Sequence, residues 1–177
     1  KEALEAKITK AKADEVIKEN RLAAAEAART FEQAIELKNL LERRATIKKY
    51  NKINSYFPDE GPLRRELYTK HTEFFTAGAS YTERCIMAAN RVGKTESIGG
   101  YESTCHLTGI DPDWWTGKRF TKPVQGWAAG DTSQTVRDIL QEKLLGDYND
   151  IGSGLIPKHL ILGVTPKTGV PQAIETI

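Results

Sequence analysis

The pattern of hydrophobic and polar residues over the first 57 positions predicts one long helix. This stretch has no glycine and no proline, and its many Ala, Glu and Lys residues are strong helix formers. Large apolar side chains are sparse over residues 1–21 and recur at three- and four-residue spacing in the second half. Because no heptad repeat is sustained, a mostly solvated helical arm is favoured over a coiled coil. The sparse set is Leu4, Ile8, Val16 and Ile17, and the denser set is Phe31, Ile35, Leu37, Leu40, Leu41, Ile47 and Tyr50.

The pattern changes at Pro58, Gly61 and Pro62, which end the helix. Beyond them, short apolar runs typical of buried strands alternate with segments of helical spacing. This alternation favours an α/β fold with a mainly parallel sheet. The chain is therefore predicted to consist of a helical arm, residues 1–57, and an α/β domain, residues 58–177. The predicted strands cover residues 83–89, 124–129 and 159–164, and the predicted helices cover residues 63–75, 95–107 and 133–145.

One segment of the second part carries recognisable chemistry. Residues 88–95 read Ala-Ala-Asn-Arg-Val-Gly-Lys-Thr, which departs from the phosphate-loop pattern G-x-x-x-x-G-K-[ST] only at Ala88. A predicted strand precedes the segment and a predicted helix follows it, which is the context that a phosphate loop requires. A chance Gly-Lys-Thr at a helix start is the alternative, and this context makes it the weaker one.

The residue types that end the motif each have a physical task. Gly93 lets the backbone approach phosphate oxygens, and successive N–H groups at the helix start offer them hydrogen bonds. Lys94 supplies a positive charge for the β- and γ-phosphates, and the Thr95 hydroxyl is a ligand for Mg²⁺. ATP and Mg²⁺ are therefore the predicted cofactors. The predicted cofactor-binding residues are Ala89, Asn90, Arg91, Val92, Gly93, Lys94, Thr95 and Glu96.

An arginine lies inside the loop, since Arg91 comes three residues before Lys94. A cationic side chain at this place can reach the γ-phosphate and stabilise charge in the transition state. A surface ion pair with Glu96 or another neighbour is an equally good interpretation. Lys94 and Arg91 are the candidate catalytic residues, with this alternative open for Arg91.

Further segments accompany the loop in a fixed order over roughly residues 56–165. They are Tyr56-Phe57-Pro58, Gly61 to Tyr68, His71 with Glu73-Phe74-Phe75, Met87 to Glu96, His106 to Gly109, Pro112 to Phe120, Trp127 to Gly130, Arg137-Asp138 and Leu144-Leu145-Gly146. Most of them are weak signals singly, and their order makes them specific. Together they resemble the large subunits of phage terminases, the motors that package viral DNA.

The resemblance implies an ATPase of the P-loop class that couples ATP hydrolysis to translocation of double-stranded viral DNA into a procapsid. The implied partners are that DNA, the portal protein and the small terminase subunit. The resemblance also implies a homo-oligomeric ring on the portal, a metal-dependent nuclease domain after the ATPase, and action in the host cell cytoplasm.

The resemblance carries over to individual residues of the loop. Gly93, Lys94 and Thr95 match the family's phosphate- and Mg²⁺-binding residues. Arg91 resembles its cis-acting loop arginine, although many members have that arginine one position earlier, where this chain has Asn90.

A second carry-over concerns the base of the nucleotide. Residues 68–75 lie where the family contacts adenine, so that Tyr68, His71 and Phe74 are candidates for stacking on it. Packing of these aromatic side chains against the N-terminal helix is the favoured alternative.

Two features of the family have no match in these 177 residues. A Walker B strand ends in Asp with a catalytic Glu beside it, but Asp131, after the second predicted strand, precedes Thr132. No acidic cluster resembles a nuclease metal site either. The resemblance therefore places both features beyond Ile177. We expect a truncated, N-terminal portion of an ATPase domain that binds nucleotide at best and hydrolyses it poorly or not at all.

Charge and composition exclude some classes of protein. Residues 1–52 hold 13 Lys and Arg against 9 Asp and Glu, a net +4, whereas residues 53–177 hold 13 against 15, a net −2. This mild basic excess permits nucleic-acid contact without demanding it. No apolar run approaches the roughly 20 residues of a membrane span, and two cysteines are too few for a disulfide scaffold.

The role of the arm stays open between three interpretations. In the first, which is favoured, the arm is a lid that packs its 31–50 face on the core. In the second it docks on a partner protein. In the third it contacts DNA phosphates through Arg43-Arg44 and Lys48-Lys49. A function of another class is also open, in which the chain is a helical interaction or assembly module attached to another P-loop NTPase such as a helicase.

Several other residues are predicted to have structural roles. Cys85 and Cys105 are expected to be small buried residues. The Trp114-Trp115 pair is expected to anchor its loop, buried on the edge of the sheet, rather than bind a partner. An ion pair with Asp138 is slightly favoured for Arg137 over contact with DNA phosphate.

Overall fold

The computed structural model describes the backbone of residues 2–177, and it describes the side chains of residue 15 and residues 18–177. The chain divides into two compact units, Lys1–Thr46 and Ile47–Ile177. The arm predicted over residues 1–57 extends across this division. The sparse apolar residues of its first part, Leu4, Ile8, Val16 and Ile17, lie outside the described side chains.

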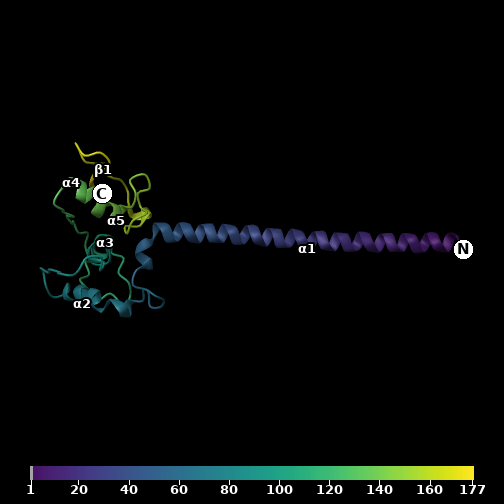
Figure 1. The fold of residues 1–177 in the computed structure, drawn as a ribbon, viewed down its shortest axis with the longest axis horizontal. Coiled ribbons are helices and arrows are strands. Elements are labelled where there is room, and N and C mark those ends of the chain that lie inside the picture. Colours follow the sequence, from purple (N-terminus) through teal and green to yellow (C-terminus); the bar gives the residue numbers. More distant parts are fainter. Residues whose placement is uncertain (1) are drawn as a thin grey trace. The chain divides into compact units, whose positions relative to one another are not determined.

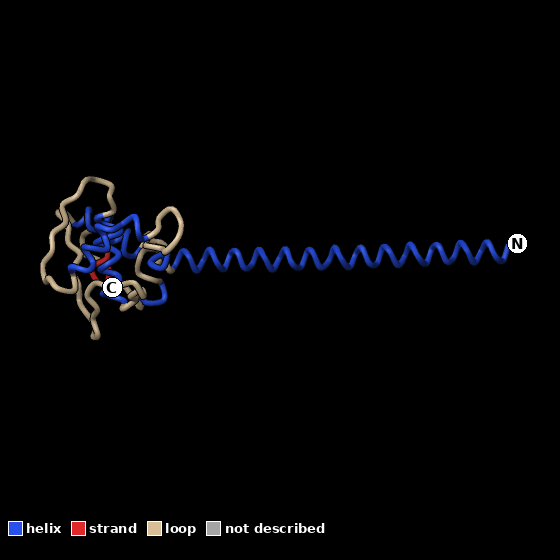
Figure 2. Tube along the Cα trace, turned by 90° about the horizontal axis from the view of Figure 1, so that it is seen from below, coloured by secondary structure: helices blue, strands red, loops and turns tan. Residues whose placement is uncertain are grey.

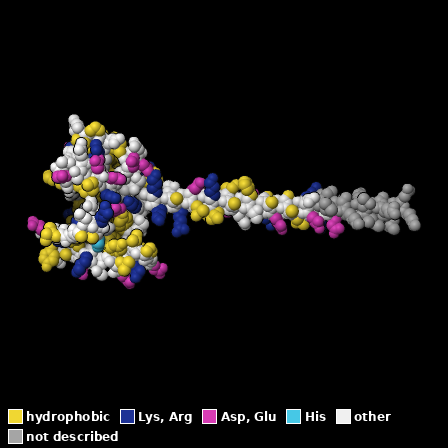
Figure 3. Space-filling model, viewed as in Figure 1, with side chains coloured by type: hydrophobic (Ala, Val, Ile, Leu, Met, Phe, Trp, Pro, Cys, Tyr) yellow, Lys and Arg dark blue, Asp and Glu magenta, His cyan; other side chains and the backbone are white. Residues whose placement is uncertain are grey.

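Helix α1 (Glu2–Tyr50) is one uninterrupted helix of 49 residues (Figure 1). Its length is about 74 Å at 1.5 Å per residue. Over the part of α1 whose side chains are described, apolar and charged side chains are interspersed on the face seen in Figure 3. The large apolar side chains from Leu22 to Ile47 are 45–67% exposed. The Asn51 side chain donates a 3.1 Å hydrogen bond to the Ile47 carbonyl where the helix ends.

The second unit holds short helices joined by long loops (Figure 2). The predicted helix over residues 63–75 is found as η2 (Arg65–Tyr68) and α2 (Thr69–Ala77). The one over 95–107 is found as a π-helical segment, η3 (Lys94–Gly100), that continues into α3 (Tyr101–Thr108). The one over 133–145 is found as α4 (Ser133–Thr135), η4 (Val136–Gln141) and α5 (Glu142–Leu145). Two further 3₁₀ turns are η1 (Lys52–Ser55) and η5 (Lys158–Leu160).

The strands differ from those predicted. One antiparallel ribbon is present, in which β1 (Thr165–Pro166) pairs with β2 (Ile174–Thr176). Residues 83–89, 124–129 and 161–164 belong to no strand ladder. Their apolar side chains Met87, Trp127 and Leu162 are 93%, 100% and 101% exposed. Strands of a parallel sheet pair with neighbouring strands and are buried on both faces. The three segments lack both features here, and the parallel sheet stays a prediction.

The core of the second unit is largely aromatic. The Phe57 ring lies in T-shaped contact with the rings of Tyr101 and Phe75, at 5.0 Å and 5.6 Å between centroids. The Trp114 ring stacks on Tyr101, and Trp115 is buried in this core, as predicted, but the expected sheet edge beside the pair is not formed, since the sheet found among the described residues is the β1–β2 ribbon. The buried members of the core are Ile53, Phe57, Phe75, Ile98, Tyr101, Cys105 and Trp115. Two of them, Ile53 and Phe57, lie inside the predicted arm, so its last residues are part of the second unit's core.

The two cysteines differ in their surroundings. Cys105 is fully buried on α3, and burial raises the pKa of its thiol to about 12. Cys85 is exposed in the loop after α2, so the prediction that both cysteines are buried is wrong for Cys85. The reason is that residues 83–89 are not covered by neighbouring strands.

The core fixes the helix that carries the phosphate-loop motif at its start. Ile98, Tyr101 and Cys105 are buried on one continuous helical segment, η3 and α3, that begins at Lys94. A Cβ atom added at Gly100 would lie 2.9 Å from Leu155 Cδ1, so a larger residue here would force the buried Leu155 side chain to shift. The start of the segment is therefore held by burial further along it.

Candidate functional site

The loop of the motif is exposed and tightly turned. Residues 87–92 are exposed, and Arg91 and Gly93 both have a left-handed backbone, with φ of 64° and 84°. A Cβ atom at Gly93 would lie 2.7 Å from Ser97 Oγ. The positive φ angle here therefore favours glycine, and a larger residue would also push against the Ser97 side chain.

The start of η3 presents free backbone donors. Its first backbone bonds run from the N–H groups of Ser97 and Ile98 to the Gly93 carbonyl, at 2.8 Å and 3.2 Å. Among the described residues, the N–H groups of residues 93–96 have no hydrogen-bond acceptor. Unpaired N–H groups at a helix start carry partial positive charge and bind anions. This arrangement is a candidate phosphate nest.

The charged side chain of the motif lies back over the loop. Lys94 Nζ donates hydrogen bonds of 2.6 Å to the carbonyls of Ala88 and Ala89. Two N–H donors of the Lys94 ammonium group are thus used by loop carbonyls, whereas in a phosphate loop they would donate to phosphate oxygens. The Thr95 side chain is exposed beside it. In the part of the chain whose side chains are described, no group of three or more His, Cys, Asp or Glu residues is arranged to hold a metal ion.

Arg91 has no ionic partner among the described residues. In particular, the predicted alternative of a pair with Glu96 is not formed, because Glu96 is held by other groups. The side chain is exposed. Its guanidinium is therefore available to an anion bound at the loop.

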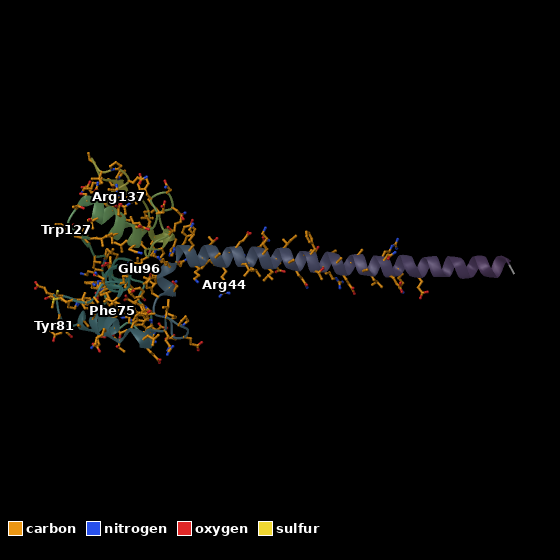
Figure 4. The ribbon with its side chains drawn as sticks, in the orientation of Figure 1. Arg44, Phe75, Tyr81, Glu96, Trp127 and Arg137 are labelled. Atoms are coloured by element: carbon orange, nitrogen blue, oxygen red, sulfur yellow. The ribbon has the colours of Figure 1, made fainter. Side chains whose placement is uncertain are left out.

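Glu96, a predicted cofactor-binding residue labelled in Figure 4, is engaged by other side chains of the second unit. Its carboxylate accepts a hydrogen bond from the Tyr56 hydroxyl and pairs with Lys143 Nζ at 2.9 Å and Lys52 Nζ at 3.3 Å. Burial alone would raise the pKa of Glu96, but Tyr56, Lys143 and Lys52 together lower it to about 2. Glu96 therefore ties the motif helix to η1 and α5.

The three candidate adenine contacts have different surroundings. His71 Nε2 lies 3.1 Å from the Val92 carbonyl of the loop. The Tyr68 ring packs edge-on against Phe57 at 5.7 Å. The Phe74 ring is covered by the Arg84 guanidinium at 4.5 Å. Of the three, His71 lies within hydrogen-bond distance of the loop, and a role in base binding stays a prediction for each.

Sequence reasoning missed the partners of Glu96. Lys52 and Tyr56 precede it by about forty residues and Lys143 follows it by about as many, and no motif joins these positions. It also missed the buried pair of Arg84 with Glu102, 3.0 Å apart. By contrast, Arg137 Nε pairs with Asp138 at 2.6 Å, as predicted.

Comparisons with known proteins identify a relative. No protein-family model matches the chain, and no solved structure matches it. The chain is 33% identical over 159 residues to the terminase large subunit of Salmonella phage P22, which covers 81% of this chain and 30% of the phage protein. The chain thus spans about a third of the length of the curated relative that it matches. The predicted resemblance is confirmed, and this chain is a relative of the phage terminase large subunits over the part that it shares with the P22 protein.

Proposed function

We propose that residues 88–96 form a phosphate loop that binds Mg²⁺–ATP in a DNA-packaging motor. The observation that carries the proposal is the set of four N–H groups at residues 93–96 that have no acceptor within the described part of the chain, together with Lys94, whose Nζ lies on the carbonyls of the same loop. A β- or γ-phosphate would take these N–H groups as donors and draw Lys94 away from the carbonyls of Ala88 and Ala89.

The neighbouring side chains complete the proposed site. Thr95 would offer its exposed hydroxyl to Mg²⁺, and Arg91 would place its guanidinium near the γ-phosphate. Such a cation stabilises the charge that develops in the transition state. Tyr68 and Phe74 are already packed within the unit, so their contribution to base binding would need their rings to move.

The wider function follows from the relative's name together with the loop. We propose that the protein uses ATP to translocate double-stranded viral DNA into a procapsid, as a ring on the portal with a small terminase subunit, in the host cell cytoplasm. Among the described residues, no helix has the length and apolar character to cross a membrane.

The proposed fold of the nucleotide domain is the α/β core with a mainly parallel sheet. The exposed apolar side chains of Met87, Trp127 and Leu162 support it, since pairing of their segments as strands would bury them. Hydrolysis needs a Walker B aspartate and a catalytic glutamate, which the 177 residues do not provide as a motif. We therefore expect this chain to bind ATP and turn it over slowly.

Titration of a non-hydrolysable Mg²⁺–ATP analogue into the chain tests the proposal. Lys94→Ala is expected to weaken binding at least tenfold, because it removes the charge that faces the phosphates. Lys122→Ala is the matched control, since Lys122 is exposed and distant in sequence from the loop. Equal affinities of the wild type and Lys94→Ala would contradict the proposal.

A helical assembly module is the second candidate. The exposure of Leu37, Leu40, Leu41 and Ile47 on α1 favours it, because large apolar side chains gathered in one stretch are typical of a partner surface. Concentration-dependent self-association in sedimentation, lost on replacing these residues with Gln and unaffected by nucleotide, would support it over the motor ATPase.

A further inference from the structure

The peptide bond between Val92 and Gly93 decides which way a loop donor points. The bond is trans and planar, so the Val92 carbonyl and the Gly93 N–H group point in opposite directions. Glycine tolerates several backbone conformations at little cost. Rotation of this peptide plane would turn the Gly93 N–H group out of the nest and the Val92 carbonyl into it. A phosphate would then face an oxygen in place of a donor.

One side chain outside the loop holds this peptide. His71 Nε2, on α2, lies 3.1 Å from the Val92 carbonyl. A carbonyl is an acceptor only, so Nε2 carries the proton and donates. The contact joins elements 21 residues apart in the sequence, and the phosphate-loop motif does not include it.

The ring of His71 is itself held in place. It lies in T-shaped contact with Tyr68 at 5.3 Å and contacts Phe57 at 6.0 Å. Phe57 is buried in the aromatic core. Burial of the imidazole lowers its pKa, which favours the neutral ring with a single N–H donor. The direction of that donor is therefore set by the core and not by the loop.

We infer that His71 is a positioning residue of the phosphate loop, which fixes the Val92–Gly93 peptide so that the Gly93 N–H group faces a bound phosphate. This inference rests on the proposed function, since the nest has a use only if it binds phosphate. It gives His71 a role through the loop backbone, different from the predicted stacking on adenine. Phosphate binding should then depend on His71 even where no base is present.

The test compares ligands with and without a base. Affinities of Mg²⁺–ATP analogue and of inorganic tripolyphosphate are measured for the wild type, His71→Ala, His71→Gln and the exposed-histidine control His159→Ala. His71→Ala is expected to weaken both ligands by the same factor, about threefold to tenfold, which corresponds to one hydrogen bond. His71→Gln keeps an N–H donor and should recover most of the affinity.

A loss confined to the ATP analogue would overturn the inference and point to base contact. Unchanged binding of both ligands in His71→Ala would overturn it as well. If wild type and Lys94→Ala both fail to bind tripolyphosphate, the proposed function fails by itself.

A measurement on the ligand-free chain then tests whether His71 orients the Val92–Gly93 peptide, independently of phosphate binding. In ¹⁵N-labelled, ligand-free chain, the Gly93 amide resonance should move in His71→Ala and stay near its wild-type position in His159→Ala. A Gly93 resonance unmoved by His71→Ala would show that the histidine does not orient this peptide, whatever the loop binds.

Discussion

Arg84 and Glu102 form an ion pair of 3.0 Å between the loop after α2 and helix α3, with side chains only 19% and 9% exposed. Arg84 also donates a 2.7 Å hydrogen bond to the Phe74 carbonyl and lies over the Phe74 ring. One guanidinium therefore joins the helix that carries His71 to the helix that continues the phosphate-loop motif. The pair therefore helps to hold α2, which carries His71, against the helical segment that begins at Lys94.

Removing one partner of this pair should destabilise the second unit strongly. Arg84→Met leaves the Glu102 carboxylate buried without its cation, which costs about 3 kcal/mol. The loss is measured as the free energy of unfolding in urea. Glu73→Gln is the matched control, because the Lys70–Glu73 pair is exposed and contributes well under about 1 kcal/mol. A loss in Arg84→Met no larger than in the control would contradict the structural role of the pair.

Gly93→Ala should damage both the loop and its binding of phosphate. The left-handed backbone costs a non-glycine residue roughly 1–2 kcal/mol, and the new Cβ would lie 2.7 Å from Ser97 Oγ. We expect lower stability in urea and at least a tenfold weaker affinity for tripolyphosphate. Gly163→Ala is the control, since its Cβ would meet nothing within 4 Å. Wild-type behaviour of Gly93→Ala in both measurements would refute the loop geometry.

The features that sequence predicted are those set by local interactions. The absence of Gly and Pro produces α1, and Gly109 and Gly146, with φ of 68° and 88°, end α3 and α5 where the pattern places those ends. The motif likewise places a glycine at position 93, where the structure has a left-handed backbone. Each of these depends on neighbours within a few residues.

What sequence did not predict depends on contacts between distant segments. The ladder partners of residues 83–89 and 124–129 are not specified by the segments themselves, and in the structure the side chains of Met87 and Trp127 stay exposed. The partners of Glu96, and the contact of His71 with Val92, arise only once the aromatic core has brought their elements together. A family resemblance supplies residue roles for the loop, but not these supporting contacts.

The two partly buried histidines should make the protein less stable in mild acid. Burial lowers the pKa of both His71 and His106 below the ordinary 6.5. Below pH 6.5 the unfolded chain therefore binds protons that the folded chain resists, and the free energy of unfolding falls as the pH falls. Urea unfolding between pH 7.5 and 5.5 measures this slope. His71→Gln and His106→Gln should each flatten it, and a slope unchanged in both variants would be evidence against this origin.

Glu96 predicts a second pH dependence, at lower pH and through its hydrogen-bonded partners. Its pKa is about 2 in the folded chain against an ordinary 4.5, so the unfolded chain binds the proton first as the pH falls. The stability that Glu96 contributes is complete above about pH 4.5 and is lost progressively toward pH 2. Glu96→Gln should remove this part of the fall in unfolding free energy with falling pH.

Tyr56→Phe should narrow the pH range over which this stability is lost by raising the pKa of Glu96. The reason is that it removes one hydrogen bond to the carboxylate and leaves Lys52 and Lys143 in place. Carbon-detected NMR titration of the Glu96 carboxylate measures this shift directly, and a pKa of 4 or above in the wild type would show that the three partners do not hold the carboxylate as the structure places them.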